Sequence, residues 1–203
     1  MRVGVAHHLG WAVLVTATDD HVVIDRRRVD LVADDLPVAP IHHRGGAHAM
    51  HADGPPLDDD ELGQLVAIVT ASVEACAAAA LDSLADSLQA PIRSISLRAW
   101  PEGFPTTIAG QRAVPYESQA DSVMYRRVLA DAAHRRGWSV HQFDGKKVES
   151  TARLLLGARA DDVLLGPRAL LGPPWNADHR MALAATVVAS AEDETDGDPP
   201  NGR

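Results

Sequence analysis

Three short apolar segments joined by tight turns open the chain, and they limit its possible folds more than any other feature. They cover residues 2–6, 11–17 and 21–32 and are rich in Val, Leu and Ile. The first connection ends in Gly10, and the second is Thr18-Asp19-Asp20. β-Branched runs bounded by turn residues predict strands, and strands joined by tight turns pair antiparallel. The chain should therefore begin with a three-stranded meander whose third strand lies at the sheet edge.

Helical and strand patterns alternate after the meander. Behind an acid-rich first turn, apolar residues recur at steps of three and four from Leu57 to Leu88, which predicts one long helix. Further strands are expected at 92–100 and 138–143, and further helices at 116–136, 148–156 and 177–190. This order predicts an α/β fold with a mixed five-stranded sheet and helices on both faces.

Two segments depart from these patterns. Residues 33–56 hold several prolines and glycines together with four histidines, and we interpret them as a long surface loop. Residues 191–203 are acidic and rich in Pro and Gly, so we expect a disordered tail. The predicted organisation is one domain over 1–190 followed by that tail. A divided Rossmann unit is disfavoured because no Gly-x-Gly-x-x-Gly turn follows the first strand.

Composition narrows the possible classes of protein. The formal net charge of −9 argues against a nucleic-acid-binding surface over the whole molecule, although a local basic face is compatible with it. The single cysteine, Cys76, excludes a disulfide framework and a cysteine-based zinc site. No apolar run approaches the roughly 20 residues of a membrane span, and the N-terminus lacks a signal-peptide pattern. We therefore expect a cytoplasmic protein that does not bind a membrane.

Three segments of the second half carry a resemblance to a known family: residues 120–122 in a predicted helix, residues 138–148 around the fifth strand, and residues 176–184 in an Ala-rich helix. They resemble the RuvC-type Holliday junction resolvases and their ribonuclease H-like relatives. The strand and helix order is also that of the ribonuclease H-like fold. The resemblance implies this fold, a two-metal nuclease site using Mg²⁺ or Mn²⁺, and structured DNA or RNA as a partner.

The family's metal ligands are mostly missing from this chain. Compared position by position, the four ligands fall at Ala6 or His7, Leu97 or Arg98, Asp178 or His179, and Met181 or Ala182. Only the third position keeps a suitable oxygen ligand, and Arg98 would repel a cation. We therefore expect a divergent member that has lost the metal site or rebuilt a different one.

Candidate catalytic residues lie where the fold would place its site. They are His7 and His8 at the end of the first strand and Asp178 and His179 at the start of the last helix, with His42 and His43 in the loop beside them. Asp178 and His179 are also candidate metal ligands, with Zn²⁺ expected if the site is histidine-based. Alternatively, the two strand-end histidines are exposed turn residues, and Asp178 is a helix N-cap.

Candidate nucleic-acid contacts are Lys146 and Lys147 after the fifth strand and Arg126 and Arg127 in the preceding helix. For the lysines, a solvated turn is the alternative. Three functions stay open at this point. The first is a divergent RuvC-like protein that binds structured nucleic acid without the two-metal site. The second is a hydrolase or nuclease with a rebuilt His/Asp site, and the third is a module that binds a protein partner.

Overall fold

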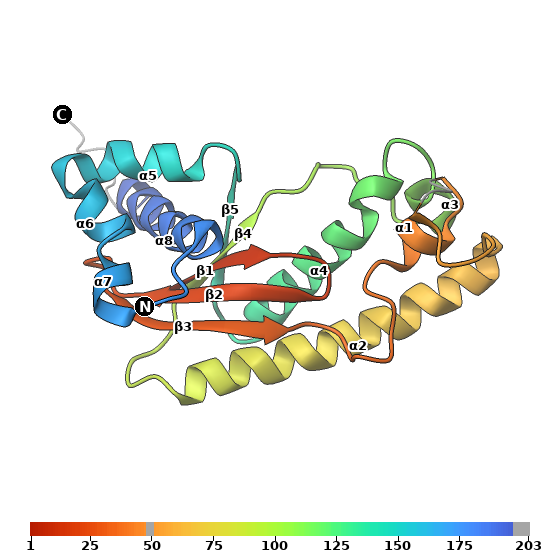
Figure 1. The fold of residues 1–203 in the computed structure, drawn as a ribbon, viewed down its shortest axis with the longest axis horizontal. Helices are drawn as coiled ribbons and strands as arrows, with labels where there is room; N and C mark the ends of the chain where they lie inside the picture. Colours follow the sequence, from red (N-terminus) through yellow and green to blue (C-terminus); the bar gives the residue numbers. More distant parts are fainter. Residues whose placement is uncertain (48–50, 197–203) are drawn as a thin grey trace.

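The computed structural model describes residues 1–47 and 51–196, in which five strands form one mixed sheet in the order β3-β2-β1-β4-β5 (Figure 1). The strands are β1 (Arg2–His7), β2 (Trp11–Ala17), β3 (Val23–Asp30), β4 (Ser94–Arg98) and β5 (Ser139–Phe143). The first three pair antiparallel, whereas β4 runs parallel to β1, and β5 runs parallel to β4. The α/β class, the meander and the edge position of β3 are confirmed.

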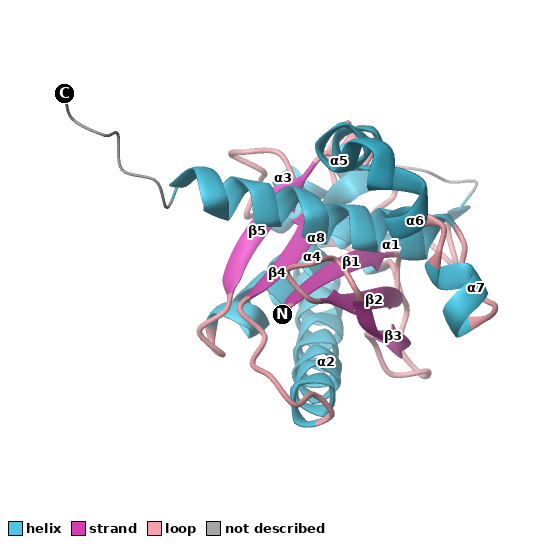
Figure 2. Cartoon of the chain, turned by 90° about the vertical axis from the view of Figure 1, so that its left-hand side faces the viewer, coloured by secondary structure: helices cyan, strands magenta, loops and turns pink. Residues whose placement is uncertain are grey.

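Helices cover both faces of the sheet, so the molecule has three layers (Figure 2). On one face, α2 (Asp59–Asp86) and α4 (Glu117–His134) pack against the apolar side chains of β1 and β4. On the other face, α5 (Val148–Leu156) and α8 (Ala177–Asp196) enclose a second apolar cluster. The shorter helices are α1 (Pro40–Arg44), α3 (Ile108–Gln111), a 3-10 turn (Gly157–Arg159), α6 (Ala160–Leu164) and α7 (Pro167–Leu171).

The long helix α2 begins at the acidic run that predicts it. The Asp58 carboxylate accepts the Glu61 N–H at 2.8 Å, and the Glu61 carboxylate accepts the Asp58 N–H at 3.4 Å. This reciprocal capping box satisfies two N–H groups that a helix start leaves unpaired. The predicted apolar stripe is correct in the first half of the helix. In the second half, Ala77 and Leu81 are buried where the spacing predicts Cys76 and Ala80, and Leu84 is buried as predicted.

α2 also corrects an expectation about membranes. It spans 28 residues, its most apolar 18-residue window has a mean hydropathy of 1.7, and 22 % of that window is buried. By length and composition, this helix could cross a membrane. The sequence reading missed this because isolated polar residues interrupt the long alanine-rich run. Six α2 side chains nevertheless lie buried in the core. The cytoplasmic location stays a prediction.

The connections hold more helix than the sequence predicts. The segment 33–56 contains α1. α6 and α7 lie between the predicted helices at 148–156 and 177–190, where the sequence pattern predicts no helix and indicates a linker over residues 168–174. α8 continues to Asp196, so residues 191–196 of the expected tail are helical, while 197–203 lie outside the described residues. Basic groups hold this acidic helix end. His141 on β5 contacts the Glu192 carboxylate at 3.0 Å, and Arg2 on β1 pairs with Asp193.

Gly4 lets α8 approach the centre of the sheet. A Cβ added at this position in β1 would lie 1.7 Å from the carbonyl oxygen of Ala182 in α8. Since that neighbour is backbone, a side-chain rotation cannot relieve the overlap. The small residue at position 4 therefore sets the spacing between the sheet and its central helix.

We predict that Gly4→Ala lowers the free energy of unfolding by about 3 kcal/mol, because the added methyl group must push α8 away from β1. Gly63→Ala in α2 is the matched control. Its Cβ would meet only the Ile108 side chain, at 3.5 Å. Replacing this helical glycine with alanine should raise the free energy of unfolding by about 0.5–1 kcal/mol. Urea denaturation of both variants measures the difference. Equal effects of the two substitutions would contradict the close approach.

Candidate functional site

A polar cleft of about 320 Å³ opens at the carboxyl ends of β1 and β4. Ligands of open α/β sheets bind at this edge of the parallel strands, which makes the cleft the candidate site. Side chains from β1, β4, α1, α4 and the β1–β2 turn line it: His7, His8, Leu9, His42, Arg98, Ser118, Asp121 and Ser122.

The guanidinium of Arg126 lies beneath the cleft and positions Ser122. Arg126 is only 5 % exposed. It donates to the backbone oxygen of Ser122 at 2.9 Å, to its Oγ at 3.1 Å, and to the carbonyl of Ala99 at 2.5 Å. The Oγ in turn lies 3.0 Å from Nε2 of His7. Because the guanidinium can only donate, this geometry lets the serine hydroxyl donate its own hydrogen to an unprotonated Nε2.

His7 is held neutral by its surroundings. Burial lowers its pKa to about 3, and the positive charge of Arg126 is the next cause, followed by His8 and Arg98. A neutral imidazole suits the hydrogen bond with Ser122. A base this weak, however, removes a proton poorly at neutral pH. His7 is therefore better suited to binding than to general-base catalysis.

Asp121 joins the histidine-rich segment to the cleft. Its Oδ1 accepts the Ile41 N–H at 3.1 Å, and its Oδ2 accepts the His42 N–H at 2.9 Å, so the carboxylate caps the start of α1. This contact places the His42 side chain on the cleft wall. Burial raises the pKa of Asp121 to about 6, although the two backbone N–H groups act in the opposite direction.

His8 is held by a ring stack and by a contact with a carboxylate. Its ring stacks on Trp11 with the centroids 4.1 Å apart, and its Nε2 lies 3.1 Å from Oδ1 of Asp178. The structure thus joins two of the four predicted catalytic residues, one from the β1–β2 turn and one from α8. The N-cap alternative for Asp178 is wrong, because α8 begins at Ala177. The side chain of Asn176 accepts the first free N–H groups of the helix instead.

His179 contacts other residues than this pair. Its Nδ1 contacts the Asn176 Oδ1 at 2.7 Å, and its ring lies 5.4 Å from that of Trp175. Burial lowers the pKa of His179, with Arg26 as the next cause. His179 therefore packs against the residues that begin α8. The His179 side chain does not join Asp178 at the predicted metal position.

The predicted basic contacts lie in different surroundings. Lys146 and Lys147 are exposed in the turn after β5, next to Gly145, which the Arg98 side chain covers. Arg126 is buried under the cleft, and Arg127 packs over the Phe104 ring on another side of α4. Of these residues, the two lysines are exposed beside Arg98, but Arg98 alone lines the cleft.

The cleft residues do not fit a pair of divalent cations. Mg²⁺ and Mn²⁺ need free carboxylate or carbonyl oxygens, whereas Asp121 is engaged by two N–H groups and Asp178 by His8. Arg98 and Arg126 add positive charge. Within residues 1–47 and 51–196, no three or more His, Cys, Asp or Glu side chains gather as a metal site. His43 pairs with Asp53 at 2.7 Å outside the cleft lining.

Sequence reasoning missed the two residues that organise this site. Ser122 and Asp121 lie in the segment that carries the family resemblance, but Asp121 reads as a helix-dipole residue and Ser122 as an ordinary helix position. Their partners come from β1 and α1, about 80 or more positions away. One local signal was available in the sequence, namely an acidic residue close to apolar residues on the buried side of α4. Asp121 and its apolar neighbour Val123 are both buried.

We predict that the buried carboxyl of Asp121 makes folding stability pH-dependent. Its pKa is about 6 in the folded protein against an ordinary 3.8, so the folded state holds the proton more tightly. The free energy of unfolding should therefore fall by about 3 kcal/mol between about pH 4 and 7. Asp121→Asn, which cannot ionise, should lose this decrease. Urea titrations of the parent and of Asp121→Asn across that pH range test this prediction. If the two proteins differ in their free energy of unfolding by the same amount at every pH, the prediction is wrong.

Comparison with known proteins identifies no relative. No protein-family model, curated protein or solved structure matches this chain. The candidate site is therefore defined by its own geometry, and the resemblance to the RuvC-type resolvases stays a prediction.

Proposed function

We propose that the protein is a divergent ribonuclease H-like domain that binds phosphate groups of structured DNA or RNA at the carboxyl edge of its sheet, without the two-metal nuclease site. The observation that carries the proposal is the positive charge of the cleft. Arg126 is buried beneath it with no carboxylate partner in the described part of the chain, and Arg98 stands exposed at its rim. Phosphate oxygens can accept from the exposed guanidinium of Arg98. Arg126 makes four hydrogen bonds within the protein, so it contributes its positive charge rather than its donors.

The rest of the surface supports a local contact rather than a broad one. Many of the other arginines are paired with carboxylates: Arg27 with Asp25, Arg93 with Asp19, Arg112 with Asp59, Arg136 with Asp82 and Arg153 with Asp161. Arg98 lines the cleft, and Lys146 and Lys147 are exposed in the neighbouring turn after β5, outside the cleft lining, where Lys147 lies 3.9 Å from Asp144. A branched or folded nucleic acid can present a phosphate to so small a positive area.

A hydrolase with a rebuilt site is the second candidate. The observation that favours it is the pair of side-chain contacts at the cleft, His7 to Ser122 at 3.0 Å and His8 to Asp178 at 3.1 Å. An aspartate that orients a histidine is a common element of acid/base sites. Here, however, the two pairs are separate, and the low pKa of His7 weakens it as a base.

We predict that Arg98→Gln weakens binding of a labelled four-way DNA junction about tenfold, since one charge-assisted hydrogen bond to phosphate is lost. It should also reduce the dependence of log K on log salt by about one. Fluorescence anisotropy in EDTA measures both. Arg135→Gln, an exposed arginine at the far end of α4, is the control and should bind as the parent does. Failure of the parent to bind either the junction or a hairpin RNA would refute the proposal.

We further predict that the junction and the RNA stay intact in Mg²⁺, Mn²⁺, Zn²⁺ and EDTA, because the cleft lacks free carboxylates and a strong base. Gel analysis after extended incubation tests this. Cleavage that disappears in Asp178→Ala but persists in Asp161→Asn, a change in an exposed carboxylate of α6, would contradict it. That outcome would favour the hydrolase with a rebuilt site.

A further inference from the structure

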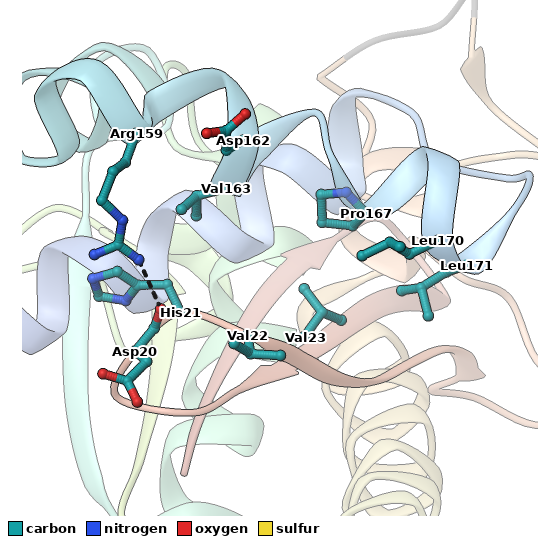
Figure 3. A pocket seen from close by; sticks show the side chains of 10 residues that line it. All are labelled: Asp20, His21, Val22, Val23, Arg159, Asp162, Val163, Pro167, Leu170 and Leu171. Atoms are coloured by element: carbon teal, nitrogen blue, oxygen red, sulfur yellow. Dashed lines mark hydrogen bonds between the residues drawn. The ribbon is translucent and has the colours of Figure 1, made fainter.

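A second cavity, of about 200 Å³, lies at the opposite edge of the sheet (Figure 3). The β2–β3 hairpin forms one wall, and α6 and α7 form the other. Six apolar side chains line it: Val22, Val23, Val163, Pro167, Leu170 and Leu171. Val22 is 57 % exposed and Leu170 is 87 % exposed, so the cavity is an open apolar trough. Exposed apolar surface of this kind is typical of a ligand-binding groove or an interaction site, where binding removes it from water.

One end of this trough is polar and carries charges of both signs. Arg159 reaches from the 3-10 turn to the hairpin and donates to the carbonyl of Asp20 at 3.3 Å. Figure 3 shows its guanidinium beside the His21 ring, while the carboxylates of Asp20 and Asp162 point away from the apolar side chains. Burial lowers the pKa of His21, and the charge of Arg159 is the next cause. The end of the trough therefore offers one permanent cation and one neutral imidazole.

The backbone at His21 is unusual for a residue with a side chain. The His21 N–H donates to the Thr18 carbonyl at 3.0 Å, and the Thr18 N–H donates to the Val22 carbonyl at 3.0 Å. This pattern is that of a three-residue hairpin loop with a bulge. The position after the turn has a φ of 67°. Glycine is the residue that this left-handed position favours. A histidine there costs backbone energy, and such outliers concentrate at ligand sites.

We propose that this trough binds a small amphipathic carboxylate, with its apolar tail among the valines and leucines and its carboxylate between Arg159 and His21. The assignment is carried by an apolar lining with a single cation at one end, where the carboxylates of Asp20 and Asp162 are directed away from the apolar side chains. A carboxylate can accept two parallel N–H groups from a guanidinium, and the imidazole can donate a third hydrogen bond.

The size of the cavity limits the ligand. Sites for drug-sized molecules occupy about 300–1,000 Å³, and this trough is smaller. We therefore expect a ligand whose apolar tail has roughly five or six carbons. This binding site is independent of the cleft at the carboxyl edge, since the two share no lining residue.

The test uses sodium hexanoate as the probe and 1-hexanol as a neutral ligand with the same tail length. Methyl NMR signals of Val22, Leu170 and Leu171 report binding on the full chain. We expect saturable shifts with hexanoate at a dissociation constant of about 1 mM, which is reasonable for so few atoms. Hexanol should bind about tenfold more weakly, because it cannot pair with a cation.

Three variants separate recognition from folding. Arg159→Gln should weaken hexanoate about tenfold, whereas Arg168→Gln, an exposed arginine of α7 outside the cavity lining, should leave binding unchanged. His21→Gly should also weaken binding while keeping or raising the thermal midpoint, since glycine relieves the backbone at that position. Absence of saturable shifts, equal binding of hexanol, or unchanged hexanoate binding by Arg159→Gln would each overturn the proposal.

Discussion

The buried guanidinium of Arg126 fixes both the geometry and the charge of the cleft. Its N–H groups donate to the carbonyls of Arg98 and Ala99 where β4 ends, and to both oxygens of Ser122 in α4. A buried charge is tolerated only where its donors are satisfied. These four contacts therefore hold α4 against the carboxyl end of the sheet in one position, and that position sets Ser122 against His7.

The charge of Arg126 has consequences for its neighbours. Together with burial it keeps His7 neutral, with a pKa of about 3, and with Arg98 it makes the cleft unfavourable for divalent cations. The carboxylates near the cleft have other roles. Asp121 caps α1, and Asp178 orients His8. In the described part of the chain, the guanidiniums of Arg98 at the rim and Arg126 at the floor have no carboxylate partner, whereas the carboxylate of Asp121 is engaged by two backbone N–H groups.

Local sequence patterns predict the layers of the fold, but they do not predict which side chains meet in the candidate site. The meander, the long helix α2 and the position of His7 at a strand end follow from local patterns of period two and period three to four, which depend only on neighbours along the chain. The contact between His7 and Ser122 joins residues 115 positions apart, and no local pattern encodes it. Asp178 is instructive because its sequence context suits an N-cap equally well. Asn176 takes that role only because α8 starts at the following residue, Ala177.

One helix contributes to both ends of the molecule. Near its start, Asp178 of α8 holds His8 beside the carboxyl-edge cleft. Further along, Val187 and Glu194 lie in a depression that also includes His21, next to the trough at the opposite edge. Between these two regions, Gly4 allows the helix backbone to rest directly on β1. A displacement of α8 at Gly4 would therefore disturb both sites through packing alone. Substitutions that leave this spacing unchanged, such as those at Arg98 or Arg159 on separate elements, are the ones that can distinguish the two sites from each other.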